Sequence, residues 1–285
     1  MFLVVVLPLI FVFTVVPILI LLYGITRWQS ETGKLRRQLE STRSQIAVRT
    51  FDPQEIEALP TPVRRYFQAA LTPNQSVVAV AEIGQRGEMR LSLDRQRWWP
   101  FTADQVILTE HPGFDWDARI RQTAGAQVFV HDSYVGGEGS LKAALFGLFR
   151  VAEQRNEDRM AQSELARFLA EAPWYPTKLL PSQGVQWSAI DEDSARATLT
   201  DGERQASAIF SFDEGGMICS VRSDERCRSE NGTLTATPWE GRFWGYEART
   251  GMRVPIQAEA AWILPSGRQA YWRGRVTDII YKFAH

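Results

Sequence analysis

The sequence predicts an α+β fold that is mainly antiparallel β. We expect a curved meander sheet, shaped like a half-barrel, packed on one or two helices and preceded by a single N-terminal transmembrane helix. Three observations support this prediction. Apolar and polar residues alternate along much of 51–285, which is typical of half-buried antiparallel strands. Turn signals such as Asn231-Gly232 separate these stretches, and an uncharged apolar run opens the chain.

The uncharged run covers residues 2–23. At 1.5 Å per residue it would span about 33 Å, enough for a bilayer core of about 30 Å. A cleaved signal peptide is the alternative, but no Lys or Arg precedes the run and no Ala-x-Ala site follows it. We therefore predict a single-pass membrane anchor over 1–24, with the lipid bilayer as a partner.

A basic segment, 25–50, follows the predicted anchor. It holds six Lys and Arg residues against two Glu residues, so the domain 51–285 is acidic in a chain of net charge −1. The positive-inside rule would place this domain in the cytoplasm, and its acidity argues against nucleic acid as a partner. A narrow helical stripe from Leu35 to Ile46 predicts a short homodimer seam or a spacer helix packed on the membrane or the domain; we favour the spacer.

Helices are predicted in four places within the domain. Asp52-Pro53 opens a short helix, and a second follows over 63–71. Residues 141–154 carry apolar residues at helical spacing and predict a third, although the first half of this segment would also suit a strand. Ser163 can cap the fourth, and Pro173 begins the proline-rich stretch that ends it. The remaining segments predict at least nine strands, mostly joined by short hairpins, so we expect sequential antiparallel pairing.

Small residues are frequent on the predicted inward faces of the strands. They are Ala118, Ala195, Ala197, Ala206, Ala208, Ala258, Ala260 and Gly274. Because protein interiors are densely packed, something must occupy the space that these residues leave. A helix lying in the curved sheet would do so, and so would an apolar ligand; we favour the helix.

Residue patterns with a definite chemistry are sparse. Neither metal-ligand spacing nor a dinucleotide or phosphate loop is present, so we predict no metal site and no cofactor. A hydrolase would have to use His131, or the helix face formed by Glu164, Arg167 and Glu171. Ion pairs at the protein surface are the simpler interpretation of that face.

Several blocks of the sequence resemble an uncharacterised bacterial family, a domain of unknown function. These blocks are LPTPVRRYF at 59–67, PGFDW at 112–116, ELARFLAEAPWYP at 164–176, LLP at 179–181, PW at 238–239 and YWRGR at 271–275. The order of elements is also similar to the LolA-like lipoprotein-carrier half-barrel, which implies a curved antiparallel sheet around helices and an apolar cavity. Because such carriers work outside the cytoplasm, the side of the membrane on which the domain lies stays open.

Together these observations predict a membrane-anchored, non-catalytic binding module for an amphipathic or lipid-like ligand such as an acyl chain. The residues expected to line its cavity are Trp116, Phe168, Trp187, Phe210 and Trp262. A hydrolase that uses the candidate residues above is one alternative. A membrane assembly partner that dimerises through Leu35–Ile46 is the other.

Overall fold

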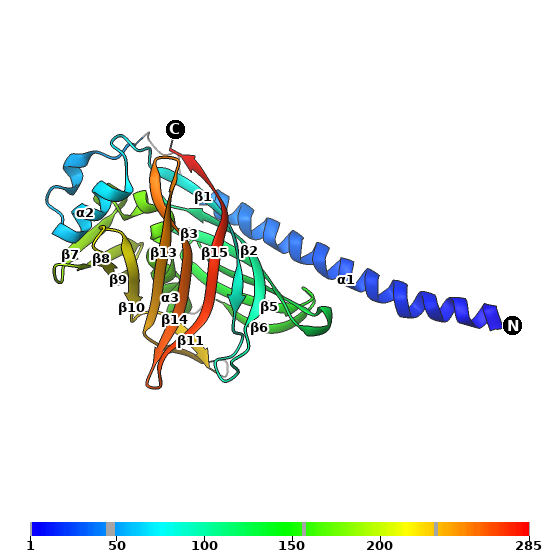
Figure 1. The fold of residues 1–285 in the computed structure, drawn as a ribbon. Coiled ribbons are helices and arrows are strands. Elements are labelled where there is room, and N and C mark those ends of the chain that lie inside the picture. Colours follow the sequence, from blue (N-terminus) through cyan, green and yellow to red (C-terminus); the bar gives the residue numbers. More distant parts are fainter. Residues whose placement is uncertain (1, 44–48, 156–157, 231–232, 285) are drawn as a thin grey trace.

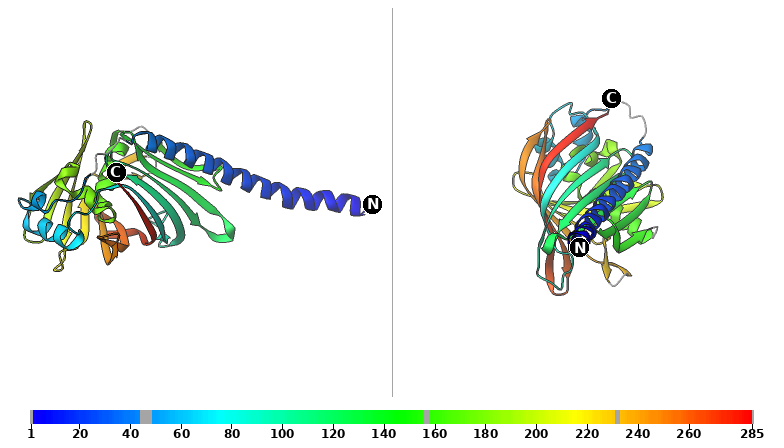
Figure 2. Two further views of the ribbon diagram at one scale, coloured as in Figure 1. Left: turned by 90° about the horizontal axis from the view of Figure 1, so that it is seen from above. Right: turned by 90° about the vertical axis from the view of Figure 1, so that its right-hand side faces the viewer.

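The computed structural model of the chain describes residues 2–43, 49–155, 158–230 and 233–284, with side chains from residue 15 onward. Within these residues, thirteen strands form one antiparallel sheet that is strongly curved and open at both edges (Figure 1, Figure 2). The expected mainly antiparallel α+β fold with a curved, open sheet is therefore confirmed.

The sheet consists of two meanders that meet in its middle. The first runs outward in chain order through β1 (Val78–Met89), β2 (Trp99–Leu108), β3 (Gly113–Arg121), β4 (Gln127–Val135), β5 (Glu138–Leu145) and β6 (Phe149–Arg155). The second begins at the opposite edge and returns through β7 (Val185–Ala189), β8 (Ser194–Asp201), β9 (Arg204–Phe212), β10 (Ile218–Ser223), β13 (Trp239–Arg249), β14 (Met252–Leu264) and β15 (Gly267–Phe283). Because β15 pairs with β1, the strands that come first and last in the sequence lie side by side in the middle of the sheet.

A separate hairpin, β11 (Cys227–Glu230) and β12 (Thr233–Ala236), interrupts the second meander. It pairs Glu230 with Thr233 across the predicted Asn231-Gly232 turn, whose two residues lie outside the described ones.

The helix α3 (Asp158–Ala170) carries the chain from β6 back toward β7. It contacts strands of both meanders, β5 and β9 most closely, so it lies on the concave face of the sheet. The apolar stripe that includes Leu165 and Phe168 is fully buried there. The helix starts before Ser163, whose hydroxyl instead accepts a hydrogen bond from the backbone of Cys227, and it ends before Pro173 as predicted.

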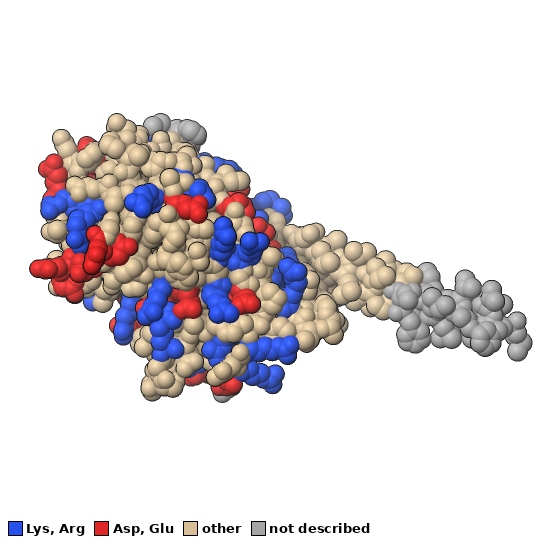
Figure 3. Space-filling view, in the orientation of Figure 1, with Lys and Arg blue, Asp and Glu red and all other residues tan. Residues whose placement is uncertain are grey.

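Two further helices are described. The helix α2 (Thr61–Ala70) contacts β8 and β14, and α1 (Phe2–Ser41) projects from the sheet toward the N-terminus (Figure 1). Short 3₁₀ helices complete the fold: η1 (Pro53–Ile56), η2 (Thr123–Gly125), η3 (Ala172–Trp174), η4 (Pro176–Leu179) and η5 (Pro181–Gln183). On the face shown in Figure 3, basic and acidic side chains are interspersed over the sheet.

The second half of α1 packs on the outer face of β2, β3 and β4. Leu39 is 1% exposed and contacts a small apolar cluster with Leu35. The described part of the Leu35–Ile46 stripe therefore packs on the protein's own sheet, as the spacer interpretation predicts, and Ile46 lies outside the described residues.

The predicted transmembrane span and membrane location need correction. In the part of the chain that the structure describes, no helix has an apolar stretch long enough to cross a membrane. The side chains described in α1 are uncharged only from Val15 to Thr26, about 18 Å of helix, before Arg27 and Glu31 follow. The rest of the predicted span, 1–14, has side chains outside the described set.

The helix predicted over 141–154 is wrong, because this segment forms β5, β6 and the turn between them. Phe146 and Gly147 have φ angles of 54° and 71°, the left-handed backbone that suits a tight hairpin. Leu141 and Leu145 are four residues apart, a spacing that shares a face in a strand as well as in a helix. The apolar spacing alone therefore did not distinguish the two structures.

Candidate functional site

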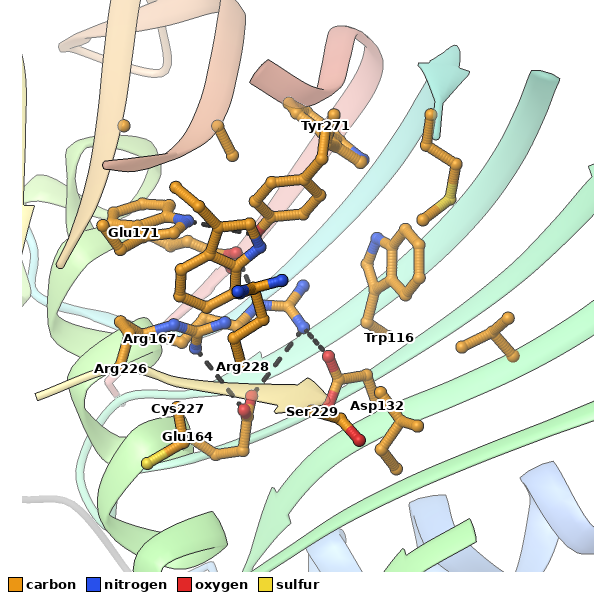
Figure 4. A pocket seen from close by; sticks show the side chains of 18 of the residues that line it. Trp116, Asp132, Glu164, Arg167, Glu171, Arg226, Cys227, Arg228, Ser229 and Tyr271 are labelled. Carbon is orange, nitrogen blue, oxygen red and sulfur yellow. Dashed lines mark hydrogen bonds and ion pairs between the residues drawn. The ribbon is translucent and has the colours of Figure 1, made fainter. Parts of the chain in front are cut away.

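A cavity of about 330 Å³ lies on the concave face, between α3 and strands of both meanders (Figure 4). Its walls are largely aromatic: Trp116, Trp174, Trp239, Phe243, Trp262, Tyr271 and Trp272. Small residues leave the space between these rings, since Gly241, Ala258 and Ala260 also line it. At Gly241 a Cβ would lie 2.7 Å from the ring of Trp239, so glycine lets that ring approach β13 closely. The small-residue face thus holds both α3 and a cavity.

The floor of the cavity is charged, and Arg167 of α3 lies at its centre (Figure 4). Its Nε donates to Glu171 Oε1 at 2.7 Å, and its Nη1 donates to Asp132 Oδ2 at 2.5 Å. The same Nη1 lies 3.8 Å from Glu164 Oε2. One guanidinium group therefore holds three carboxyl groups that come from β4, from α3 and from the residue that follows α3.

Asp132 and Glu164 form a carboxyl pair on this floor. Within the described residues, Asp132 Oδ1 and Glu164 Oε2 are buried without a hydrogen-bond partner. Burial, and then the charge of Asp132, raises the pKa of Glu164 to about 8, and burial also raises the pKa of Asp132. A protonated Glu164 can donate to Asp132, so one shared proton satisfies both oxygens. Glu164 therefore keeps its proton to a higher pH than an exposed glutamate does.

A chain of hydrogen bonds links this floor to the aromatic wall. Glu171 Oε2 accepts from Gln105 Nε2 at 2.7 Å, and Gln105 Oε1 accepts from Gln85 Nε2 at 3.3 Å. Gln85 Oε1 in turn accepts from Trp116 Nε1 at 2.8 Å. Because its indole N–H is fixed at one end, the ring of Trp116 is held in place before any ligand enters.

The structure brings two of the five predicted cavity residues to the cavity. Trp116 and Trp262 line it, and their contact with a ligand stays a prediction. Phe168 is fully buried beneath it against Tyr175. Trp187 and Phe210 pack on each other, with ring centroids 5.2 Å apart, on β7 and β9 beyond its walls.

The sequence did not indicate several residues that complete the cavity. Asp132 reaches the floor from β4, and Arg226 reaches it from the segment before β11, where Nη1 lies 3.4 Å from Glu164 Oε1. The alternation along β4 does place Asp132 on the face opposite to His131. No comparable signal marks Arg226, because a loop residue has no periodic pattern.

His131 lies on the outer face of the sheet, away from the cavity. Its ring stacks on Trp28 of α1, with centroids 4.3 Å apart, and its Nε2 is 2.7 Å from Thr32 Oγ1. Burial lowers the pKa of His131 to about 4, so the imidazole is neutral at pH 7. The two hydrolase candidates from the sequence, His131 and the Glu164 face, are therefore on opposite faces of one sheet.

Comparison with known proteins gives one family and a few distant structures. A family described as "Family of unknown function (DUF6920)" matches residues 57–281, as the sequence blocks predict. None of the curated proteins matches. The fold is similar to a LolA superfamily protein from Nitrosomonas europaea, with 10% identity, TM-score 0.37, and coverage of 79% of this chain and 94% of the other. It is also similar to a DUF1329 family protein from Desulfovibrio piger, with 11% identity, TM-score 0.38 and the same coverage.

Proposed function

Because the chain belongs to the DUF6920 family, whose function is unknown, we propose its function from the cavity: a non-catalytic binding module for an amphipathic or lipid-like ligand. One observation supports this proposal above all. The cavity combines an aromatic wall with a charged floor, so a ligand with an apolar body and a polar end fits it in one orientation.

The apolar body of the ligand would supply most of the binding free energy. The cavity has a volume of about 330 Å³, which is within the usual range for small-molecule sites. Each buried methylene contributes about 0.8 kcal/mol, so six of them give about 5 kcal/mol before the cost of association. We propose that Trp116 and Trp262 contact this part of the ligand.

Filling the cavity tests the proposal. Co-purified molecules are first removed from the full chain by solvent extraction, and mass spectrometry of the extract identifies them. The stripped protein should then bind decanol with a change in tryptophan fluorescence. The variant Ala260→Phe places a ring inside the cavity and should lose at least tenfold in affinity. Ala248→Phe makes the same substitution at an exposed position of β13 and should bind as the wild type does. Equal binding by both variants, or no binding of decanol at all, would refute a ligand cavity here.

An enzyme remains the second candidate, because the carboxyl pair Asp132–Glu164 has the raised pKa that acid–base catalysts need. A hydrolase that uses this pair should cleave p-nitrophenyl decanoate, and both Asp132→Asn and Glu164→Gln should abolish the activity. Hydrolysis that is absent from the wild type, or retained by both variants, would leave the binding module as the better account.

A further inference from the structure

The floor of the cavity carries more carboxyl groups than buried bases. Three carboxyl groups, Asp132, Glu164 and Glu171, face two buried guanidinium groups, Arg167 and Arg226. If every group were ionised, the floor would hold one unbalanced negative charge in a low-dielectric site, which is costly. The proton on the carboxyl pair removes that charge.

The surrounding charged groups do not change this balance. The charged and titratable side chains that line the cavity are Asp132, Glu164, Arg167, Glu171, Arg226, Cys227, Arg228, Glu259 and Tyr271. Arg228 pairs with Glu230, and Glu259 pairs with Arg268 at 2.5 Å. Tyr271 stays neutral, because burial raises the pKa of its hydroxyl. One positive charge is therefore the amount that the floor can still accept.

The position for that charge lies between the two carboxyl groups. Arg167 holds Asp132 through Oδ2, and Arg226 holds Glu164 through Oε1. The other oxygen of each group is the one that lacks a hydrogen-bond partner among the described residues. Asp132 and Glu164 both line the cavity, Glu164 is only 2% exposed, and the open oxygen of each is itself buried, so a ligand that reaches these oxygens must separate the pair.

The walls also suit a cation. The guanidinium carbon of Arg226 lies 5.7 Å from the ring centroid of Trp239, and that of Arg167 lies 5.4 Å from that of Trp116. Faces of indole rings attract positive charge, and the attraction is stronger where water is excluded. The Trp262 ring, which stacks on Tyr271 with centroids 5.5 Å apart, adds aromatic surface nearby.

We propose, on the premise that the cavity holds an amphipathic ligand, that the polar end of this ligand is a primary ammonium group bound between Asp132 and Glu164. The ammonium N–H groups donate to the two open carboxylate oxygens and replace the shared proton, which is released to solvent. The charge of the floor is thus balanced in both states, by a proton when the cavity is empty and by the ligand when it is filled.

Three compounds of equal chain length test this inference on the full chain: decylammonium, decanol and decyl sulfate. At pH 8.5 we expect decylammonium to bind at least tenfold more tightly than decanol, and decyl sulfate to bind most weakly. The advantage of decylammonium over decanol should fall about 25-fold between pH 8.5 and pH 6.5, because below a pKa of about 8 the ligand must displace the proton. Calorimetry in buffers of different ionisation enthalpy should count about one proton released at pH 7.

Variants locate the effect at the carboxyl pair. Glu164→Gln should remove both the advantage of decylammonium and its pH dependence while it keeps decanol binding, and Asp132→Asn serves the same purpose if Glu164→Gln does not fold. Glu259→Gln removes the same charge from the cavity wall and should keep the pH dependence.

The outcomes separate this inference from the proposed function. If none of the three compounds binds, the proposed function itself fails. If decanol binds and decylammonium shows no advantage at pH 8.5, the cavity stands and the ammonium site does not. Preferred binding of decyl sulfate would also overturn the inference, and it would point to Arg226 and Arg228, each of which keeps a buried Nε without a hydrogen-bond partner in the described structure.

Discussion

The two faces of β3 and β4 carry similar residues but differ in what covers them. On the concave face, Trp116 and Asp132 line a cavity together with Arg167. On the outer face, Asp117, which follows Trp116, and His131, which precedes Asp132, lie beneath α1. Each face thus has acids, an arginine and a tryptophan. Alternate positions of the two strands supply Trp116 and Asp132 to one face and Asp117 and His131 to the other, while α3 adds Arg167 and α1 adds Trp28.

Residues of α1 supply most of the partners of the outer cluster, although Asp115 Oδ1 is buried without a hydrogen-bond partner among the described residues. Asp117 accepts from Arg119, from the indole of Trp28 at 2.9 Å and from Thr32 at 3.2 Å. Arg36, further along α1, donates to Asp115 at 2.9 Å. On the outer face, α1 therefore supplies hydrogen-bond donors to the carboxyl groups of the sheet. On the inner face, the carboxyl groups border a cavity instead. The comparison shows two uses of charged groups next to tryptophan. On the outer face they hold α1 on the sheet, and on the inner face, where a cavity remains, they form a candidate binding site.

Removal of Arg167 should have the largest effect on stability. Arg167→Met leaves three carboxyl groups without their common partner, and breaking a buried pair on one side costs about 3–5 kcal/mol. Urea denaturation of the full chain measures this loss. Arg36→Met is the outer-face control, and it should cost less because the Arg36 side chain is 35% exposed and its removal leaves one buried carboxyl group, Asp115, instead of three. Equal losses would mean that the two clusters do not differ in burial as described.

Truncation of Trp28 should separate the faces by function. Its ring is fully buried against Phe129 and His131, and such truncations cost about 3 kcal/mol or more. We expect Trp28→Ala to detach α1, seen as faster proteolysis after residues 25–41, while decanol binding is unchanged. Trp244→Ala, at a tryptophan that is 43% exposed, is the matched control and should change neither measurement. Loss of decanol binding in Trp28→Ala would show that the faces are coupled.

Alkaline pH should destabilise the protein through the inner cluster. The folded-state pKa of Glu164 is raised, so its contribution is complete below the unfolded value of 4.5 and is lost as the pH rises through about 8. We expect the free energy of unfolding to fall by about 1 kcal/mol between pH 7 and pH 9 from this group. Glu164→Gln should flatten that slope in urea titrations, and a slope unchanged by the substitution would contradict the shared proton.

Acidic pH should act on the outer cluster through two opposing groups. Burial lowers the pKa of His131 to about 4, so its stabilising contribution is present above pH 6.5 and is lost as the pH falls. Burial raises the pKa of Asp115 to about 6, so its contribution grows as the pH falls through that value. Each amounts to about 1–2 kcal/mol between pH 7 and pH 5, and they largely offset each other.

Single variants should reveal each group. Asp115→Asn removes the opposing gain, so the variant should lose about 2 kcal/mol between pH 7 and pH 5 through His131. His131→Gln should instead gain stability over the same range. If both variants follow the wild-type pH profile, neither group titrates as the burial of this face requires.

The contrast between the faces also explains how far the sequence was informative. The alternation of Trp116 with Asp117 predicted strands correctly, and the spacing of Glu164, Arg167 and Glu171 predicted that they share one helix face. Both are local patterns with a fixed period. The spacing favoured surface ion pairs, and burial of the face is visible only once Asp132 pairs with Arg167 across the concavity.

Other features depended on distant contacts. The strands that α3 crosses determine whether a residue lines the cavity or packs at the end of the sheet. No local sequence pattern shows which strands those are. Trp187 and Phe210 are aromatic residues in alternating strand segments, as Trp262 is, yet they pack on each other at the β7 edge. The segment 141–154 was assigned wrongly for a related reason, since its apolar spacing suits two structures and the left-handed backbone at Phe146 decides between them.

An ion pair outside both clusters should contribute least. Arg273 and Glu88 form a cross-strand pair on β15 and β1 in which both side chains are about half exposed. Exposed pairs contribute about 0–1 kcal/mol because water already solvates each charge, so Arg273→Ala should lower the free energy of unfolding by less than about 0.5 kcal/mol. Urea denaturation beside Arg167→Met makes the comparison direct. Arg167→Met removes an arginine from three buried carboxyl groups, and Arg273→Ala removes one from an exposed carboxylate. A similar loss of stability in both would mean that burial does not set the energetic contribution of charge in this protein, and the distinction between the two faces would then lose its physical basis.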